Sequence, residues 1–570
     1  MAVVHYLIDL IRWHRLELFW PIWCTLTAAA IICTAWMLRL WPVQGLYKPE
    51  QYKPEESHRP QFRLDRTSII CIVMLGVFLG AYSAMILVGE DFAMYDNSQF
   101  TSFSLRGVNF PVQIWPQGGR FFPLGLQEFN LIGHFTRTIY GYHALPIAEL
   151  VILALIFLSL DEQVSIATRV LLAIATLITP SVVVSFTGLI YPERNILLLL
   201  LCLALFIKRF EQTRFAPWAI AMVLCAQILL YLKEPVFLLL LGFSSARILM
   251  RIRTADRAWS VAHLWNYENR LDLCLAALAM AYIAFFASMT LPYTGAQYLA
   301  DRHVSLIEAV RYYVHTDLLA WIFAIVFTVR SLGIMRRVIV PDLLWDGLAC
   351  GGVAYFASYV GLRMVSSYYL APVDLIAVAY VGHLISSSWG EWPFRVRALA
   401  AVLGVCVVLQ SLELSAFRVL ERKYFIQQKS AMARVILEAY RREPGSVLKV
   451  SFPLTEPYML SEFASYLSYR GGPVEEEVGD RLLPGAGIRI LGARIAKDGR
   501  CVTWRTFVCH PESADASGVV IVLPDDVVLS PEDATLRQRI LDRLHSSDPR
   551  TLPLRWLIAV LRFHWAHGPR

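Results

Sequence analysis

The sequence predicts an all-α polytopic membrane protein of about twelve membrane-spanning helices, followed by a soluble α/β domain at the C-terminus. Hydrophobic residues make up 57% of the 570 residues and charged residues only 17%, well below the roughly 25% usual in soluble domains. Long apolar segments recur until about residue 415, after which the chain becomes polar. These observations together indicate a membrane domain and a separate C-terminal domain.

The membrane domain begins after an N-terminal region, residues 1–66. This region contains a short apolar segment, 1–12, which we expect to lie in the membrane interface, then one span and a polar linker. Because about 20 mostly apolar residues cross a bilayer, twelve segments are candidate spans. They lie near 17–38, 67–89, 145–160, 170–190, 195–207, 216–232, 235–250, 271–290, 317–335, 343–362, 369–388 and 398–415.

The orientation of these spans follows from the Lys and Arg residues in the loops, since cytoplasmic loops carry an excess of both. If the even-numbered spans run outward, the inner loops hold 19 of these residues and the outer segments hold 10. This places the long loop 90–145 and everything after residue 415 outside. We therefore expect a protein of the bacterial inner membrane, with its polar loop and C-terminal domain in the periplasm.

The net charge of +7 is not concentrated in one block, so nothing indicates a nucleic acid partner. Loops that face anionic lipids explain the excess. Cysteines lie mostly inside apolar segments, and no Cys or His spacing is typical of a zinc site. Cys501 and Cys509 are the exception, because a periplasmic domain permits a disulfide between them if a turn separates them.

The C-terminal region, residues 416–570, reads as a charged helix followed by short strands. The strands are expected at Val447–Phe452, Ile488–Ile495, Val502–Val508 and Val519–Leu523, with a helix at 531–546. Residues 552–565 mix basic and aromatic positions with apolar ones. They fit either a membrane surface or the last helix of this domain.

Acidic residues mark the start of the outer loop, directly after the second span. Glu90 and Asp91 follow Gly89, and Asp96 comes soon after. A carboxylate held at the membrane boundary can accept the proton of a reacting hydroxyl. Asp91 is therefore the main candidate for a catalytic base and Glu90 its competitor, while Asp96 is a candidate substrate or metal ligand. The alternative is that these acids are simply solvated.

Three outer segments carry cations beside acids or aromatic residues. Arg120 follows Gly118-Gly119 and precedes Phe121-Phe122, and arginine matches the geometry of phosphate. Two short outer turns contain the pairs Glu193-Arg194 and Lys233-Glu234, each beside a proline. These cations are candidates for phosphate binding and Glu193 for substrate binding. Local ion pairs and helix punctuation are the alternative.

Further polar candidates lie near the ends of later spans. Arg363 could pair with a lipid phosphate, and Tyr368 and Tyr369 follow it on the same side. Tyrosines are common at membrane interfaces without any function in binding. His303 could carry a proton or bind a metal, although a lone loop histidine commonly does neither. A divalent metal ion is thus left open as a cofactor, and none is certain.

The spans have few charges at their centres, and the chain has no Walker loop, dinucleotide fingerprint, nucleophile elbow or zinc helix. A site at the outer interface follows more naturally than a pathway across the bilayer. Because an outer site has no access to cytosolic nucleotides, the group to be transferred would arrive on a lipid.

These features together resemble the GT-C class of membrane glycosyltransferases, which use polyprenyl-phosphate sugars. The resemblance covers residues 67–415 and is carried by Gly89-Glu90-Asp91, Gly119-Arg120-Phe121 and Tyr191-Pro192-Glu193-Arg194, in this order and on this side. The chain resembles the bacterial branches of that class, which include relatives of the dolichyl-phosphate-mannose protein mannosyltransferases and the lipid A aminoarabinose transferase. The span at 17–38 is an addition to the usual pattern of that class.

The resemblance implies a single displacement at the outer face. Asp91 or Glu90 would be the base, and Arg120, Lys233, Arg363 and Arg194 would hold the donor phosphate. Candidate substrate-binding residues are Asp96, Glu193, His303, Tyr368 and Tyr369. The acceptor would be a glycan, a lipid or a protein. The alternatives are an oligosaccharide polymerase or ligase, a lipid or glycan transporter, and a non-catalytic assembly protein.

Overall fold

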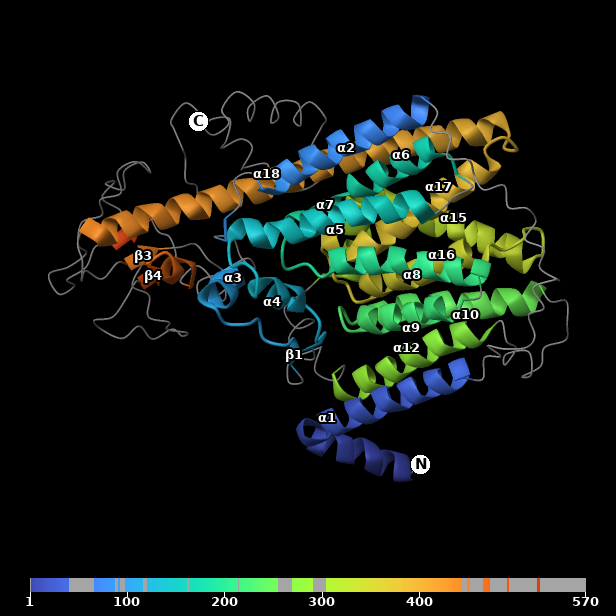
Figure 1. Cartoon of the computed structure of the whole chain (residues 1–570), viewed down its shortest axis with the longest axis horizontal. Coiled ribbons are helices and arrows are strands. Elements are labelled where there is room, and N and C mark those ends of the chain that lie inside the picture. The colour runs from blue at the N-terminus through green and yellow to red at the C-terminus, as the bar shows by residue number, and fades with distance from the viewer. Residues whose placement is uncertain are drawn as a thin grey trace.

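The structure is a computed structural model that describes residues 2–39, 66–87, 91–92, 98–115, 120–160, 164–213, 215–254, 269–290, 304–442, 449–451, 465–471, 489–491 and 520–522. The described part is mostly helical, and its long helices lie roughly side by side (Figure 1). The first half contains α1 (Ala2–Arg39), α2 (Arg66–Leu87), α3 (Ser98–Ser102), η2 (Ser104–Arg106), α4 (Gln127–Gly133), α5 (Ile139–Leu160), α6 (Ile166–Leu177), α7 (Pro180–Thr187), α8 (Glu193–Thr213), α9 (Ala216–Leu230) and α10 (Val236–Thr254).

The second half contains α12 (Arg270–Met289), α14 (Leu306–Thr316), α15 (Leu318–Met335), α16 (Leu343–Gly361), η6 (Ser367–Leu370), α17 (Ala371–Ser388) and α18 (Phe394–Arg442). Several of these helices begin at side chains suited to that position. Ser305 and Glu308 form a capping box at the start of α14, and Asp317 and Asp342 cap α15 and α16. Such side chains satisfy backbone N–H groups that have no partner within the helix.

Each of the twelve predicted spans overlaps a helix, but not every helix meets the requirements for crossing a membrane unaided. Seven described helical segments are long and apolar enough, and α6 with α7 would make an eighth despite a 69° bend between them. The seven are Leu16–Trp36, Arg66–Leu87, Ile139–Leu160, Arg270–Met289, Leu318–Met335, Ser367–Ser388 and Phe394–Val419. Helix α9 is short, α8 carries charged residues at both ends, and α10 carries them near its C-terminal end. The fold is therefore that of a multi-pass membrane protein.

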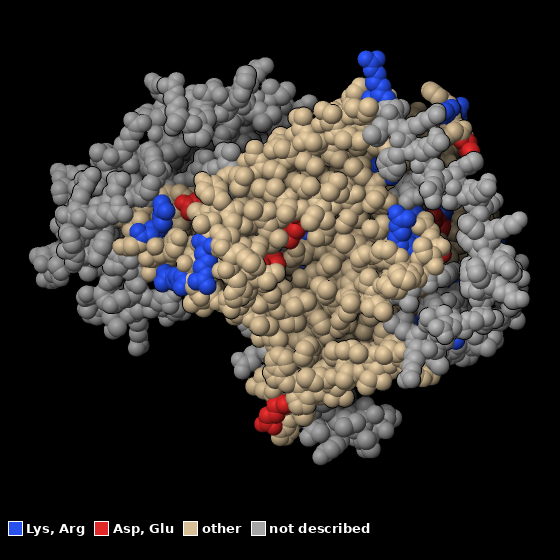
Figure 2. All heavy atoms as spheres, viewed as in Figure 1, with Lys and Arg blue, Asp and Glu red and all other residues tan. Residues whose placement is uncertain are grey.

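The surface agrees with this conclusion. Figure 2 shows Lys and Arg side chains gathered toward two ends of the molecule, with a broad face of mostly uncharged residues between them. Many large apolar side chains of the described helices are exposed, for example on α2 and α18. Exposed apolar surface of this extent is expected where lipid replaces water.

Helix α1 changes direction near its start. The backbone leaves the helical conformation at His14 (φ −106°, ψ 18°), and the apolar segment Leu16–Trp36 follows. Figure 1 shows the N-terminal part of α1 at an angle to the rest. That residues 1–12 lie in the membrane interface stays a prediction.

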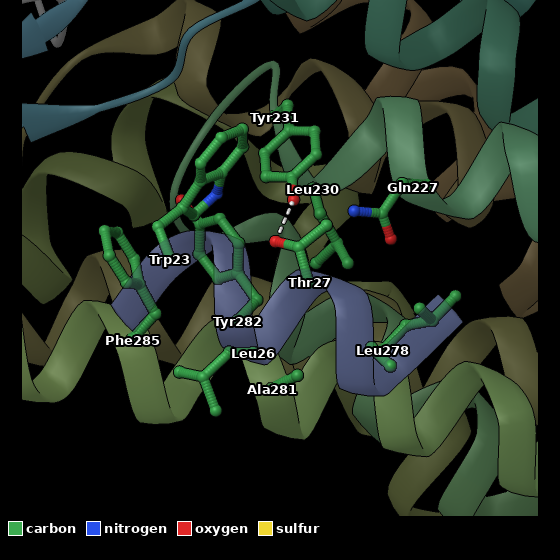
Figure 3. A pocket seen from close by; sticks show the side chains of 11 residues that line it. Trp23, Leu26, Thr27, Gln227, Leu230, Tyr231, Leu278, Ala281, Tyr282 and Phe285 are labelled. Carbon is green, nitrogen blue, oxygen red and sulfur yellow. Dashed lines mark hydrogen bonds between the residues drawn. The ribbon is translucent and has the colours of Figure 1, made fainter. Parts of the chain in front are cut away.

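The span in α1 packs on α12, so it is part of the bundle. Between α1, α9 and α12 lies a cavity of about 20 Å³, lined by Trp23, Thr27, Tyr231, Tyr282 and Phe285 among others (Figure 3). The hydroxyl oxygens of Thr27 and Tyr231 lie 3.2 Å apart across it. A cavity of this size holds about one water molecule. It is too small for a substrate.

Helices α10 and α16 approach each other closely in the middle of the bundle. A Cβ atom on Gly351 would lie 2.3 Å from the carbonyl oxygen of Leu239, and one on Gly242 would lie 3.0 Å from the Cα atom of Gly351. Glycine is the residue that permits such contact between helix backbones. This helix pair therefore depends on the absence of side chains at both positions.

Helix α18 extends well past the other helices (Figure 1). It has 49 residues, or about 74 Å of length, and only Phe394–Val419 is a candidate span. After it, the described residues contain a parallel sheet in the order β4-β3-β5, formed by Lys449–Ser451, Arg489–Leu491 and Val520–Val522.

This sheet overlaps three of the four predicted C-terminal strands, but each of its strands has only three residues. No strand-rich domain is present among the described residues. The predicted strand at 502–508, the helix at 531–546, residues 552–565 and both Cys501 and Cys509 lie outside the described residues.

Candidate functional site

Several of the predicted site residues meet at one end of the helix bundle, which we call the loop end. The loop end carries the described residues 98–115 and 120–135 and the turns 188–192 and 231–235 (Figure 1). Its short hairpin pairs Ile114–Trp115 (β1) with Arg120–Phe121 (β2). The hairpin places Arg120 beside the turn between α9 and α10.

Arg120 forms an ion pair with a carboxylate. Its Nε atom donates to Oε1 of Glu234 at 2.9 Å, and the backbone N–H of Phe121 donates to the same oxygen at 3.2 Å. The hydroxyl of Tyr282 donates to the carbonyl of Phe121 at 2.9 Å. The Arg120 guanidinium also lies 4.5 Å from the ring of Phe122. These contacts fix the hairpin against α12 and the turn between α9 and α10.

Lys233 forms the second ion pair, which is buried. Its ammonium bonds to Oε1 of Glu193 and lies 4.4 Å from the ring centre of Tyr369 and 5.0 Å from that of Tyr368. Tyr191 stacks on Tyr368 at 4.3 Å. Burial lowers the pKa of Lys233, while the Glu193 carboxylate opposes this change. The predicted residues Lys233, Glu193, Tyr368 and Tyr369 therefore do form one cluster.

Arg194 belongs to a third group and points away from this cluster. Its guanidinium donates to Glu149 and Glu128, at 2.7 Å each, and to the carbonyl of Leu189. Its side chain is fully buried, so no position remains for a lipid phosphate. Arg194 joins α8 to α4 and α5, a structural role that differs from the predicted phosphate contact.

The charges at the loop end are thus almost balanced within the protein. Arg120, Lys233 and Arg194 each have a carboxylate partner. Arg363 is the remaining predicted phosphate ligand. It is exposed, has a left-handed backbone (φ 57°), and its side chain makes no hydrogen bond or ion pair with the described residues. Of the four predicted cations, Arg363 is the one with its charge free for an anion.

Among the described residues, Asp91 takes no part in these ion pairs. Its Oδ1 atom accepts from the backbone N–H of Phe92 at 2.8 Å. Its Oδ2 atom accepts from the hydroxyl of Ser430 at 2.8 Å and from that of Tyr466. Within the described residues, Asp91 is therefore half-buried, bonded to neutral donors, and without a cationic partner.

A series of aromatic side chains connects the Asp91 region to Arg194. Phe92 stacks on Phe100 with 5.0 Å between ring centres, and Phe100 packs on Phe129 at 4.8 Å. The guanidinium of Arg194 lies 4.8 Å from the ring of Phe129. The segment that begins at Asp91 is thus packed against the buried Arg194 group through three phenylalanines.

Two buried carboxyl groups were not among the predicted site residues. Asp317 caps α15 by accepting from the backbone N–H of Ala320 at 2.9 Å, and Asp374 in α17 accepts from the hydroxyl of Ser181. Both side chains are buried. The order of residues along the chain gave no sign that they are.

The residues that contact Asp91 also escaped prediction. Ser430 and Tyr466 are common residue types, 339 and 375 positions away from Asp91. Three predicted residues, Glu90, Asp96 and His303, lie outside the described residues. Within the described ranges, no group of three or more His, Cys, Asp or Glu side chains is arranged to hold a metal ion.

The fold and the apolar helices define a multi-pass membrane protein. No model of a known protein family matches the sequence, and no curated protein matches it. The function must therefore be argued from the site itself.

Proposed function

We propose that the protein is a membrane glycosyltransferase that moves a sugar from a polyprenyl-phosphate donor to an acceptor at the loop end. In this proposal all twelve predicted spans cross the membrane in a GT-C-like arrangement. The loop end and the C-terminal region face the periplasm of a bacterial cell. Partners are the lipid-linked donor, membrane lipids and a glycan, lipid or protein acceptor.

The environment of Asp91 is the observation that carries this proposal. Asp91 follows the α2 span and is half-buried, and its carboxylate bonds to neutral hydroxyl and backbone donors. A carboxylate that is not bound in an ion pair is available to take the proton of an acceptor hydroxyl. Glu128, Glu149, Glu193 and Glu234, by contrast, are each paired with a cation.

Two features of the structure match the two parts of the lipid-linked donor. Arg363 offers an uncommitted cation for the phosphate, whose charge grows as the bond to the sugar breaks. An apolar groove of about 490 Å³ runs along α10 from Leu238 to Met250, with α15 and α16 on its other side. Leu238 comes shortly after Lys233-Glu234, so the groove begins near the loop end. A hydrocarbon tail fits such a lining.

Substitution of Asp91 tests the proposal. Asp91→Asn keeps the shape of the side chain but removes its basicity, so sugar transfer should fall at least a hundredfold while the protein stays folded in the membrane. The measurement is the incorporation of labelled sugar in membranes that lack the native protein and contain the variant. Glu391→Gln, an exposed acid before α18, is the matched control.

Full activity in both Asp91→Asn and Glu90→Gln would refute the proposed base. Sidedness needs a separate test. A reporter that is active only in the periplasm, fused after residue 440, should be active. Activity from a cytosolic reporter alone at that position would show that the orientation is inverted.

A further inference from the structure

The Asp91 carboxylate is held by groups from the far end of the chain. Its Oδ2 atom accepts two hydrogen bonds, from Ser430 on α18 and from Tyr466 in the short helix that follows residue 464. A carboxylate oxygen has about two lone-pair positions, so Oδ2 is fully occupied. Oδ1 accepts one bond, from the backbone N–H of Phe92, and among the described residues it has no second donor.

Residues 465–470 are docked on the outer loop by further hydrogen bonds. The hydroxyl of Ser102 donates to that of Ser465 at 2.7 Å. Arg106 donates to the carbonyl of Ser465 at 3.1 Å and to that of Thr101 at 2.7 Å. Ser465 and Leu467 are buried in this contact. The segment is therefore fixed on both sides of Tyr466.

The two residues that donate hydrogen bonds to Asp91 are also held in place. Tyr466 is 1% exposed, and burial together with the Asp91 carboxylate raises the pKa of its phenol. Tyr466 therefore keeps its proton at neutral pH and remains a donor. On α18, Lys423 donates to the carbonyl of Ile86 at 3.3 Å. That bond ties α18 to the end of α2, five residues before Asp91.

We propose that Tyr466 and Ser430 are positioning residues for Asp91, so that the C-terminal segment 465–470 completes the active site. This inference rests on the proposed function. The two hydroxyls anchor Oδ2 and leave Oδ1 to act as the base. During transfer, the acceptor's hydroxyl proton moves to Oδ1 and its oxygen bonds to the anomeric carbon. The bond between that carbon and the phosphate oxygen breaks, and its electron pair leaves with the lipid phosphate.

Removal of one hydroxyl at a time tests this positioning. Tyr466→Phe should lower the maximal rate of sugar transfer at least tenfold, because a misplaced catalytic group loses much of its effect. The amount of donor that gives half-maximal rate should not change. The donor probe is the polyprenyl-phosphate sugar fraction extracted from the same cells and titrated into membranes that contain the full-length variant. Tyr469→Phe, an exposed tyrosine in the same segment, should behave as wild type.

Ser430 provides an independent pair of variants. Ser430→Ala should lower the maximal rate several-fold, whereas Ser430→Thr keeps a hydroxyl and should restore most of it. If Ser430 had a purely structural role, Ser430→Ala and Ser430→Thr should lose equal amounts of activity, and less folded protein should be present in the membrane. Maximal rates equal to wild type in both Tyr466→Phe and Ser430→Ala would overturn the inference. If Asp91→Asn were inactive in the same membranes, the proposed function would survive that result.

A crosslink tests whether the docked segment is the active state. The hydroxyl oxygens of Ser102 and Ser465 lie 2.7 Å apart, so Ser102→Cys with Ser465→Cys should form a disulfide under mild oxidation. The crosslinked protein should transfer sugar at the rate of its reduced form. Loss of transfer on oxidation, with recovery on reduction, would show that docking inhibits the enzyme and would overturn the inference. The single cysteine variants are the controls.

Discussion

Arg194 and Glu149 form an ion pair within the helix bundle, with Nε of the arginine 2.7 Å from Oε2 of the glutamate. The same guanidinium lies 2.7 Å from Glu128. One fully buried side chain thus connects three helices. A charge in this position has lost its hydration and depends on its partners. The ion pair therefore contributes to the fold rather than to the binding of a substrate.

We expect Arg194→Met to destabilise the protein strongly, because it leaves two buried carboxylates without a cation. The free energy of unfolding should fall by about 3–5 kcal/mol, measured by titration of detergent micelles with SDS. Arg336→Met, at an exposed arginine beyond α15, is the matched control and should differ from wild type by less than about 0.5 kcal/mol. Equal stability of the two variants would contradict the structural role.

A double-mutant cycle tests the ion pair between Lys233 and Glu193. Lys233→Met alone should destabilise by about 3 kcal/mol, because it leaves the buried Glu193 carboxylate unpaired. Addition of Glu193→Gln removes that charge and should recover at least about 1 kcal/mol. SDS-induced unfolding of both single variants and the double variant gives the coupling energy. Additive losses would show that the two side chains do not interact.

Gly351 should tolerate no side chain. In Gly351→Ala the new Cβ meets the Leu239 carbonyl oxygen at 2.3 Å, so α10 and α16 must separate, at a cost of about 1–3 kcal/mol. Gly404→Ala, also within a helix but with nothing within 4 Å of its Cβ, should be neutral or stabilising. Thermal unfolding in one detergent compares the two variants. A stable Gly351→Ala protein would argue against this helix contact.

Arg363 provides a test of donor binding. Arg363→Asn removes the charge but tolerates the left-handed backbone, so more of the extracted lipid donor, about tenfold, should be needed for half-maximal sugar transfer. Arg337→Asn is the matched control, since Arg337 is also exposed and left-handed (φ 60°). Unchanged donor dependence in Arg363→Asn would exclude Arg363 as a phosphate ligand.

The sequence predicted the positions of the helices well. Each predicted span overlaps a helix because apolar segments in a bilayer must satisfy their own backbone hydrogen bonds. The count of twelve spans stays a prediction, because helices such as α8 and α10 carry charges that only their packing explains. Arg247 and Arg251 of α10, for example, pair with Asp272 of α12 and Glu211 of α8.

The partner of each charged residue was beyond prediction. Glu193 and Arg194 are neighbours in sequence, as are Lys233 and Glu234, and both looked like local ion pairs. Adjacent residues on a helix or turn point in different directions. Each of the four residues therefore pairs across the bundle, with Lys233, Glu149, Glu193 and Arg120 respectively.

The sequence by itself determined which long apolar segments are helical, the approximate positions of the three described C-terminal strands, and that charges collect at the helix ends. Hydrophobicity and backbone hydrogen bonding are local or periodic properties, so a linear pattern records them. Only the tertiary structure decided that Arg194 is structural, that Arg363 is free, and that Asp91 bonds to Ser430 and Tyr466. These relationships join residues far apart in the chain, and they exist only once the helices have packed.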